Sequence, residues 1–280
     1  MVELKYKELT KMVFESSDRS VQITRSSLIL IMIFAIGLTG IGCDGTPSQD
    51  PQFSIEKEEW VTKPKNEWPQ IVLTNEASFV GHTPLEGASS FLIKTNGNQV
   101  FAATAAHLIG EAGGVEPPIP ISQLSQKIRS WKMFPRTMPN DSIEADSIAV
   151  QGLDKENLDW LILSIKDTLN LPSYPLIIRK NPVQVGEQVY LIGCPYCEPT
   201  AKQNVYVGKV TERLYGDRFR FDITPPVDIH GFSGAPIVDK NGHLVGVMTV
   251  SFNPRMSGDK FLEAGGEDIA SIYDLLETNH

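Results

Sequence analysis

A histidine, an aspartate and a serine occur in three short segments whose residue types suit acyl transfer. His107 ends the small-residue run TAAH, Asp159 opens the apolar run DWLIL, and Ser233 lies between two glycines in GFSGAP. Histidine, aspartate and serine in this order along the chain is one of the known orders of a catalytic triad. These three residues are therefore the first candidates for a nucleophilic site.

The chemistry of such a site assigns a role to each residue. A serine hydroxyl is a weak nucleophile at neutral pH, so an imidazole must take its proton and later deliver it to the leaving group. His107 would be that base, and Asp159 would hold the imidazole in the required tautomer. The backbone N–H groups of Gly231 and Ser233 would stabilise the oxyanion, and loss of one such donor costs about 3–4 kcal/mol in the barrier.

Each segment also has a simpler explanation when it is taken alone. A histidine after a small-residue strand is usually a packed or exposed residue, and an acid before an apolar strand is often a turn residue. The GFSGAP segment could be a tight turn before an edge strand. Asp154 is a rival for the acid, but its neighbours indicate a loop. The joint order of the three segments favours a triad with Asp159.

The elements that must position these residues are predicted to be mostly strands. With 22 Gly and 19 Pro in 280 residues, the composition favours short strands and turns over long helices. Apolar runs at strand period are separated by turn signals, among which Asn96-Gly97 is the strongest hairpin signal. One amphipathic helix is predicted at residues 267–277. The predicted strands are residues 89–94, 99–103, 131–134, 147–150, 160–165, 188–192, 204–210, 218–223, 235–238 and 243–251.

At the three segments the chain resembles the trypsin-like serine peptidases, most closely the bacterial Do/HtrA branch. The stretch GEQVYLIGCPYC adds to the resemblance, which covers about residues 71–277. It implies an all-β fold of two antiparallel six-stranded β-barrels with a C-terminal α-helix and the triad in the cleft between the barrels. Within a protease domain of residues 71–280, we expect half-barrels at about 71–166 and 183–266.

The chain departs from this family at two points. Phe232 precedes the serine, where the family usually has Asp or Asn. Packing of Phe232 or of neighbouring loops must then hold the oxyanion turn. The residues after Ser251 are too few for the peptide-binding PDZ module that often follows in the Do/HtrA branch, so we expect a protease domain without one.

The resemblance also indicates a pocket for the substrate side chain before the scissile bond. Val227 is expected at its floor, which favours a small or apolar substrate residue. A shift of one position would put Asp228 there instead and favour Lys or Arg. His230 is a candidate for the pocket wall, or an exposed loop histidine, and Thr249 and Ser251 are further candidates for the lining.

The first 43 residues are predicted to be a signal peptide or a membrane anchor. Residues 28–42 form an uncharged apolar run that follows basic residues and is short for a spanning helix. Cys43 comes directly after this run, as in a lipoprotein signal, and is a candidate for lipidation. Residues 44–70 are polar and rich in proline, which predicts a linker. We therefore expect an exported protein, periplasmic or at the cell surface, with any membrane contact through this amino-terminal segment.

The net charge and the positions of the cysteines limit which partners and cofactors the sequence predicts. A formal net charge of −9 without a dense run of Lys and Arg argues against nucleic acid as a partner. Cys194 and Cys197 form a CPYC motif that predicts a disulfide, because the βαβ context of a redox site is missing. A second pair of metal ligands is not found near them, so we expect no metal and no cofactor.

Together these observations predict a membrane-tethered serine endopeptidase that acts on proteins or peptides through an acyl-enzyme, in envelope protein processing or quality control. The alternative is a trypsin-fold protein of the envelope that binds partners without turnover. A redox protein that uses Cys194 and Cys197 is a third hypothesis. The sequence gives no indication of the oligomeric state.

Overall fold

The structure is a computed structural model, and it describes residues 56–150, 158–196, 202–215, 217–249, 255–258 and 260–278. All of these residues belong to one compact unit, Phe53–His280. Several predictions concern residues outside the described part: the apolar run 28–42, Cys43, Asp154, Cys197 and Ser251. In the part of the chain that the structure describes, no helix is both long and apolar enough to cross a membrane.

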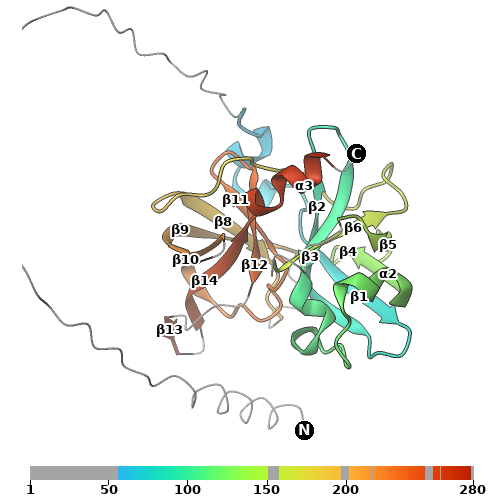
Figure 1. The fold of residues 1–280 in the computed structure, drawn as a ribbon. Helices are drawn as coiled ribbons and strands as arrows, with labels where there is room; N and C mark the ends of the chain where they lie inside the picture. Colours follow the sequence, from blue (N-terminus) through green and yellow to red (C-terminus); the bar gives the residue numbers. More distant parts are fainter. Residues whose placement is uncertain are drawn as a thin grey trace, which may run out of the picture. The chain divides into compact units, whose positions relative to one another are not determined.

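The described residues fold into two closed antiparallel β-barrels of six strands each (Figure 1). The first barrel consists of β1 (Leu73–Phe79), β2 (Leu85–Lys94), β3 (Val100–Ala105), β4 (Ile128–Phe134), β5 (Ile143–Ile148) and β6 (Trp160–Ile165). The second barrel consists of β8 (Gln188–Gly193), β9 (Asn204–Leu214), β10 (Arg218–Val227), β11 (Pro236–Asp239), β12 (Leu244–Thr249) and β14 (Lys260–Asp268). Two strands of two residues each, β7 (Leu176–Ile177) and β13 (Met256–Ser257), pair with β2 and β14 respectively.

The strand order is equivalent in the two barrels. The first sheet runs β1-β4-β5-β6-β3-β2 and closes through the β1–β2 pair, and the second runs β10-β9-β8-β11-β12-β14 and closes through β10–β14. Closure leaves the six strands without a free edge. The predicted all-β fold of two six-stranded barrels is confirmed.

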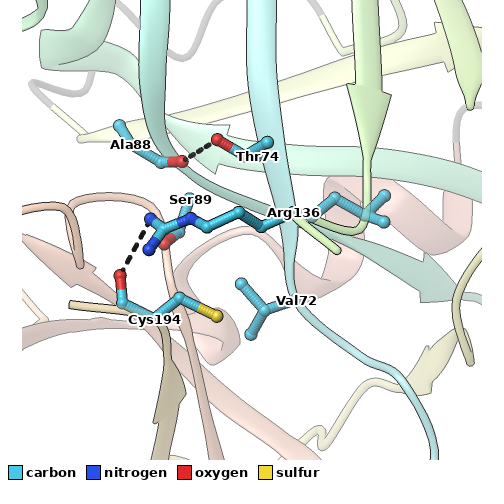
Figure 2. A pocket seen from close by; sticks show the side chains of 7 residues that line it. Val72, Thr74, Ala88, Ser89, Arg136 and Cys194 are labelled. Carbon is cyan, nitrogen blue, oxygen red and sulfur yellow. Dashed lines mark hydrogen bonds between the residues drawn. The ribbon is translucent and has the colours of Figure 1, made fainter. Parts of the chain in front are cut away.

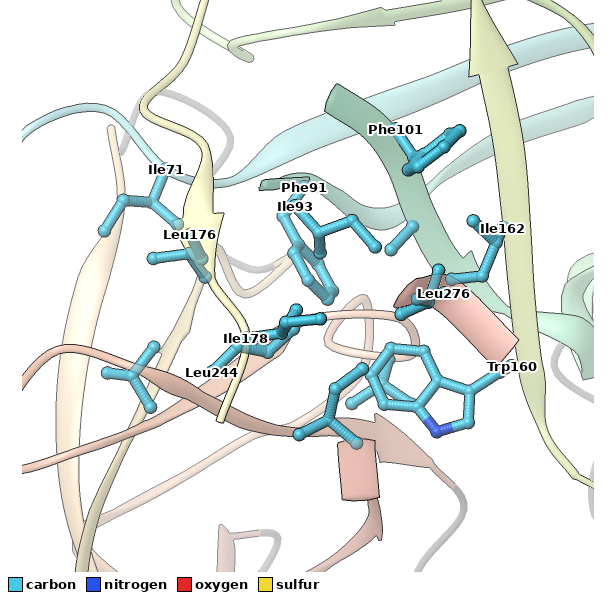
Figure 3. Packing of buried hydrophobic residues seen from close by; sticks show 14 of the residues in the cluster. Ile71, Phe91, Ile93, Phe101, Trp160, Ile162, Leu176, Ile178, Leu244 and Leu276 are labelled. Atoms are coloured by element: carbon cyan, nitrogen blue, oxygen red, sulfur yellow. The ribbon is translucent and has the colours of Figure 1, made fainter. Parts of the chain in front are cut away.

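Buried side chains form three clusters that explain how the barrels are held together. One fills the first barrel, around Trp131 and Leu161, and one fills the second, around Phe219 and Phe221. The third lies between the barrels and draws residues from both. Figure 3 shows it where Phe91, Ile93 and Trp160 of the first barrel face Leu244 of the second and Leu276 near the carboxyl end. The relative position of the barrels is thus fixed by burial of apolar surface.

Short helices connect and cover the barrels. The carboxyl-terminal helix is shorter than predicted, because residues 267 and 268 belong to β14 and α3 begins only at Tyr273. Ile269, Ile272 and Leu276 nevertheless bury their side chains between the barrels, as the apolar stripe of the sequence requires. The helices are η2 (Glu59–Thr62), η3 (Lys65–Glu67), η4 (Ala106–Ile109), η5 (Glu111–Gly113), α2 (Ile121–Lys127), η6 (Ile269–Ser271) and α3 (Tyr273–Thr278).

The segment before Ile71, expected to be a linker, is folded from residue 56 onward. Trp60 and Trp68 are only 5% and 8% exposed and meet edge to face, with ring centroids 4.8 Å apart. The Glu58 N–H donates to the Asn241 carbonyl oxygen in the β11–β12 turn, 2.9 Å away. The sequence does not predict that this segment packs on the barrels, because the two tryptophans lie in a polar stretch without helical or strand periodicity.

Candidate active site

His107 and Asp159 form a close pair at one edge of the first barrel. The His107 ring Nδ1 lies 2.6 Å from Asp159 Oδ2, and the His107 backbone N–H donates to Asp159 Oδ1 at 2.8 Å. Both side chains are mostly buried, with 17% and 16% of their surfaces exposed. A carboxylate that accepts from Nδ1 leaves Nε2 as the basic nitrogen, which is the tautomer a general base needs.

The strand register explains why these two residues meet. His107 follows β3 in the first turn of η4, and Asp159 directly precedes β6. Because β3 and β6 are antiparallel, with Ala105 opposite Trp160, the end of one strand lies beside the beginning of the other. The Ala106 N–H donates to the Asp159 carbonyl oxygen at 3.0 Å and continues this pairing into η4.

The other ring nitrogen of His107 is available for proton transfer. Nε2 is buried, and among the described residues it has no hydrogen-bond partner. Ser233 Oγ therefore lies outside hydrogen-bonding geometry with Nε2 in this structure. Long or misaligned contacts of this kind are common in proteins without bound substrate and shorten when substrate binds.

Backbone contacts hold the Ser233 turn against the strands that lead to His107. The Ser89 N–H of β2 donates to the Ser233 carbonyl oxygen at 2.9 Å, and Ser89 Oγ donates to the Gly231 carbonyl oxygen at 2.8 Å. On its other side, the Ser89 carbonyl oxygen accepts from Thr104 Oγ1 at 2.7 Å. Thr104 is three residues before His107, so Ser89 connects the serine turn to the histidine segment.

Gly234 allows the close approach of the two barrels at this point. A Cβ at this position would lie 2.2 Å from the Ser89 carbonyl oxygen and 2.4 Å from Thr104 Oγ1. Its φ of +82° also lies in the left-handed region that favours glycine. The second glycine of GFSGAP is therefore required by the contact between Ser233 and β2, and a tight turn alone would not demand it.

Two backbone N–H groups of the same turn have no acceptor in the part of the chain that the structure describes. The N–H groups of Phe232, Gly234 and Ala235 donate to backbone carbonyls within the second barrel. Among the described residues, those of Gly231 and Ser233 donate to none. Unpaired backbone donors beside a nucleophile are what an oxyanion site requires.

Phe232 holds this turn from below. Its side chain is fully buried in the core of the second barrel and meets Tyr206 edge to face, with centroids 5.5 Å apart. A Cβ on Gly193, at the end of β8, would lie 2.2 Å from the Phe232 ring. Close packing of an aromatic ring thus occupies the position where the family usually has a polar residue.

A second contact joins the serine turn to the first barrel through Tyr196. Its ring lies against Gly231, where a Cβ would be 2.8 Å from the ring carbons, and its hydroxyl accepts from the Ala88 N–H. The Tyr196 N–H donates to the His230 carbonyl oxygen at 3.1 Å. Tyr196 is therefore placed to fix Gly231, one of the two residues with an available N–H.

Arg136, which follows β4, anchors the loop that carries Tyr196. Its guanidinium donates to the Pro195 carbonyl oxygen at 2.9 Å and to that of Cys194 at 3.1 Å, and it lies 5.7 Å from the Tyr196 ring centroid. Figure 2 shows the Arg136 side chain extending from the first barrel to the Cys194 carbonyl, beside Ser89 and Val72. One arginine thus spans the two barrels next to the serine turn.

Replacing Arg136 with alanine should destabilise the protein by about 2–3 kcal/mol, because two hydrogen bonds from a charged donor are lost across the barrels. Arg136→Lys should recover only part of this, since an ammonium group cannot form the same fork. Urea unfolding of both variants measures the difference. Unfolding free energies equal to that of the wild type would show that the Arg136 contacts do not contribute to stability.

The residues predicted to line a substrate pocket lie at several places in the second barrel. Val227 ends β10 and is buried in the barrel core, and Thr249 ends β12 and is buried as well. Asp228 and His230 form an exposed pair in which Asp228 Oδ1 is next to His230 Nδ1. The pairing occupies the Asp228 carboxylate, the group that would attract a basic substrate side chain.

Cys194 lies at the beginning of the loop that carries Tyr196. Its thiol donates to the Lys202 carbonyl oxygen. Because Cys197 is outside the described residues, the predicted disulfide stays a prediction. Among the described residues, no three His, Cys, Asp or Glu side chains come together as metal ligands would.

Three residues of the site have no signal in the sequence. Ser89, Tyr196 and Glu267 reach it through contacts between the barrels, and Glu267 Oε2 accepts from the Asp159 N–H at 2.8 Å. Ser89 and Tyr196 contact Gly231, which is 142 and 35 positions away, and Glu267 contacts Asp159, which is 108 positions away. Contacts at such separations follow no local sequence pattern. Only the two-barrel arrangement identifies them.

Comparisons with known proteins bear on the family and the fold of this chain. A family model described as a trypsin-like peptidase domain matches residues 88–247, more than half of the chain. Protease Do-like 5, chloroplastic, of Arabidopsis thaliana is 32% identical over 114 residues, which are 39% of this chain and 35% of that protein. The match thus spans about a third of the relative's length.

Two solved structures share the fold at low sequence identity. The active form of the Rv3671c protease from M. tuberculosis is 18% identical, with a TM-score of 0.50, over 79% of this chain and 86% of that one. The serine endoprotease from Yersinia pestis is also 18% identical with a TM-score of 0.50, over 75% of this chain and 63% of that one. At this identity the likeness shows the fold alone.

Proposed function

The chain belongs to the trypsin-like peptidase domain family, and from this premise we propose that it is a serine endopeptidase with His107, Asp159 and Ser233 as its triad. The observation that carries the proposal is the His107–Asp159 pair, whose Nδ1–Oδ2 distance is 2.6 Å and whose buried Nε2 has no partner among the described residues. Ser233 supports it, since its carbonyl oxygen is tied to Ser89 on the strands that lead to His107.

The proposed reaction proceeds in two steps. In the first, Ser233 Oγ bonds to the carbonyl carbon of the substrate while its proton passes to His107 Nε2, and the same nitrogen then protonates the amine as the C–N bond breaks. In the second, His107 takes a proton from water, the resulting hydroxide displaces Ser233, and the proton returns to the serine oxygen. The N–H groups of Gly231 and Ser233 would stabilise the oxyanion in both steps.

The substrates we propose are proteins or peptides. Val227 and Thr249 would contribute to a pocket that accepts a small or apolar side chain, since the Asp228 carboxylate is paired with His230. Hydrolysis by this triad uses no cofactor. We further propose that the protein is exported through its first 43 residues and is tethered to the membrane by them or by lipid on Cys43. There it would act in envelope protein processing or quality control.

Labelling with a fluorophosphonate probe tests the proposal. We expect the wild-type protein to be labelled at one residue and Ser233→Ala to show no labelling, because the probe reacts only with a serine that has an active general base. Ser130→Ala is the matched control and should be labelled like the wild type, since Ser130 is an exposed serine of β4 whose hydroxyl pairs with that of Ser78. Near-ultraviolet circular dichroism verifies that each variant is folded. A folded wild-type protein that the probe does not label would favour the alternative, a binding protein without turnover.

A further inference from the structure

Glu267 is a buried acid beside the candidate triad. It lies near the end of β14, opposite Arg218 of β10 and Val247 of β12, and its side chain is fully buried. A carboxylate in such a place is costly unless it is paired, and an apolar residue of similar size would often be as stable. The position therefore calls for a reason other than packing.

The contacts of Glu267 point toward Asp159. Oε2 accepts from the Asp159 backbone N–H at 2.8 Å and lies 3.6 Å from Arg218 Nε. Oε1 has no partner among the described residues. The carboxylate thus belongs to the second barrel but hydrogen-bonds to the acid of the first, at the residue directly before β6.

This bond completes the set that fixes Asp159. Its carbonyl oxygen accepts from the Ala106 N–H, its Oδ1 accepts from the His107 N–H, and its own N–H donates to Glu267. Of these three bonds, only the last comes from the second barrel, which also carries Ser233. It therefore fixes the position of the Asp159–His107 pair relative to the second barrel.

We propose that Glu267 is a positioning residue, which orients Asp159 and through it His107 by accepting the Asp159 N–H. The inference rests on the proposed function, because it gives Glu267 a part in the same reaction. Glu267 does not touch the reacting atoms. Arg218, its partner on β10, holds the carboxylate in place.

The charge of Glu267 is expected to respond to pH near neutrality. Burial raises the pKa of its carboxyl to about 7, and the Asp159 charge acts in the same direction, while the Asp159 N–H and Arg218 oppose the shift. The groups that face it are Arg218 from β10, Asp159 before β6 and, behind Asp159, His107 on η4; its β12 neighbour Val247 is apolar. Asp268, the next residue, pairs instead with Arg213.

Two replacements separate the hydrogen bond from the charge. Glu267→Gln keeps an oxygen that can accept the Asp159 N–H but removes the negative charge. Glu267→Leu removes both. Glu212→Gln is the matched control, since Glu212 pairs with Arg220 on the surface of the same barrel and its replacement removes one charge from an exposed side chain.

The rate of fluorophosphonate labelling, measured across the neutral pH range, is the first measurement. Glu267→Leu should lower the plateau rate by up to about 10²-fold, as small misplacements of catalytic groups do. Glu267→Gln should keep the plateau, because its amide oxygen can still accept the Asp159 N–H. The Glu212→Gln profile should match the wild type. A wild-type plateau in folded Glu267→Leu, or a plateau in Glu267→Gln as low as that of the Leu variant, would overturn the proposal.

A second measurement is independent of turnover. In a Ser233→Ala background, the downfield proton resonance of His107 Nδ1–H should persist with Glu267 or Gln at position 267 and be lost or shifted with Leu. Should the wild-type protein escape labelling altogether, the proposed function fails, and this resonance still tests whether Glu267 orients the pair. An identical resonance in all three proteins would refute the role of Glu267. If Glu267→Leu does not fold, Glu267→Asp replaces it in both measurements, because the shorter side chain withdraws the acceptor from the Asp159 N–H while keeping the charge.

Discussion

Asp159→Asn should lower the rate of fluorophosphonate labelling by about 10⁴-fold while leaving the fold intact. In the wild-type protein, the Asp159 carboxylate accepts at both oxygens, from the His107 backbone N–H at 2.8 Å and from the His107 ring Nδ1 at 2.6 Å. An amide can accept at only one of them and would present an NH₂ group to the other. If the amide keeps the bond to the backbone, the imidazole must place its proton on Nε2, where it can no longer act as base.

The pH dependence of labelling in the Asp159→Asn variant distinguishes a wrong His107 tautomer from unfolding of the protein. Labelling should recover partly at high pH, where the serine needs less assistance from a base. Asp167→Asn is a suitable control, because Asp167 is an exposed acid whose carboxylate accepts from the nearby Leu169 N–H and from Asn170. A labelling rate within a few-fold of wild type would mean that Asp159 does not set the tautomer of His107.

Phe232→Ala should reduce the free energy of unfolding by about 3–5 kcal/mol, the usual cost of removing a buried phenylalanine ring. The ring is fully buried, contacts Tyr206 and fills the space above Gly193. Because Ser233 is its neighbour, the cavity would lie directly beneath the serine turn. Labelling should therefore fall in the variant even under conditions where it is folded.

Urea unfolding measures the loss of stability in Phe232→Ala. Labelling at urea concentrations well below the unfolding midpoint measures the loss of reactivity in the folded variant. Tyr215→Ala is the matched control, since Tyr215 is fully exposed and its loss should change stability by less than about 0.5 kcal/mol. Phe232→Asp, which introduces a residue usual in the family, should be less stable than Phe232→Ala, because the charge would be buried without a partner. Equal stability of Phe232→Ala and the wild type would contradict the packing role given to the ring.

The strands that the sequence identifies are those whose pattern is local. β6 has the predicted bounds, and the Asn96-Gly97 signal correctly joins β2 and β3. Both depend on apolar alternation and turn chemistry, which a short window contains. The resemblance to trypsin-like peptidases, carried by the three motifs, is confirmed by the family match.

β14 was not predicted because its composition opposes a strand. The run KFLEAGGED contains two adjacent glycines and three acids, a poor strand sequence by propensity. The structure gives the reason for one glycine: a Cβ on Gly266 would lie 2.5 Å from Ile237 Cδ1 and 2.7 Å from the Phe219 ring. This requirement comes from other strands, so no window around Gly266 could reveal it. The predicted helix at residues 267–277 includes Glu267, which the structure places in β14 instead.

The folded segment before β1 has a mechanical consequence. Residues 56–70 lead into β1 of the first barrel, yet Glu58 is hydrogen-bonded to Asn241 in the second, and Tyr174 donates to the Glu58 carboxylate. Tension on the chain ahead of Glu58 would therefore load the β11–β12 turn before it reached β1. The strands behind His107 would be shielded from a pull at the amino-terminal side.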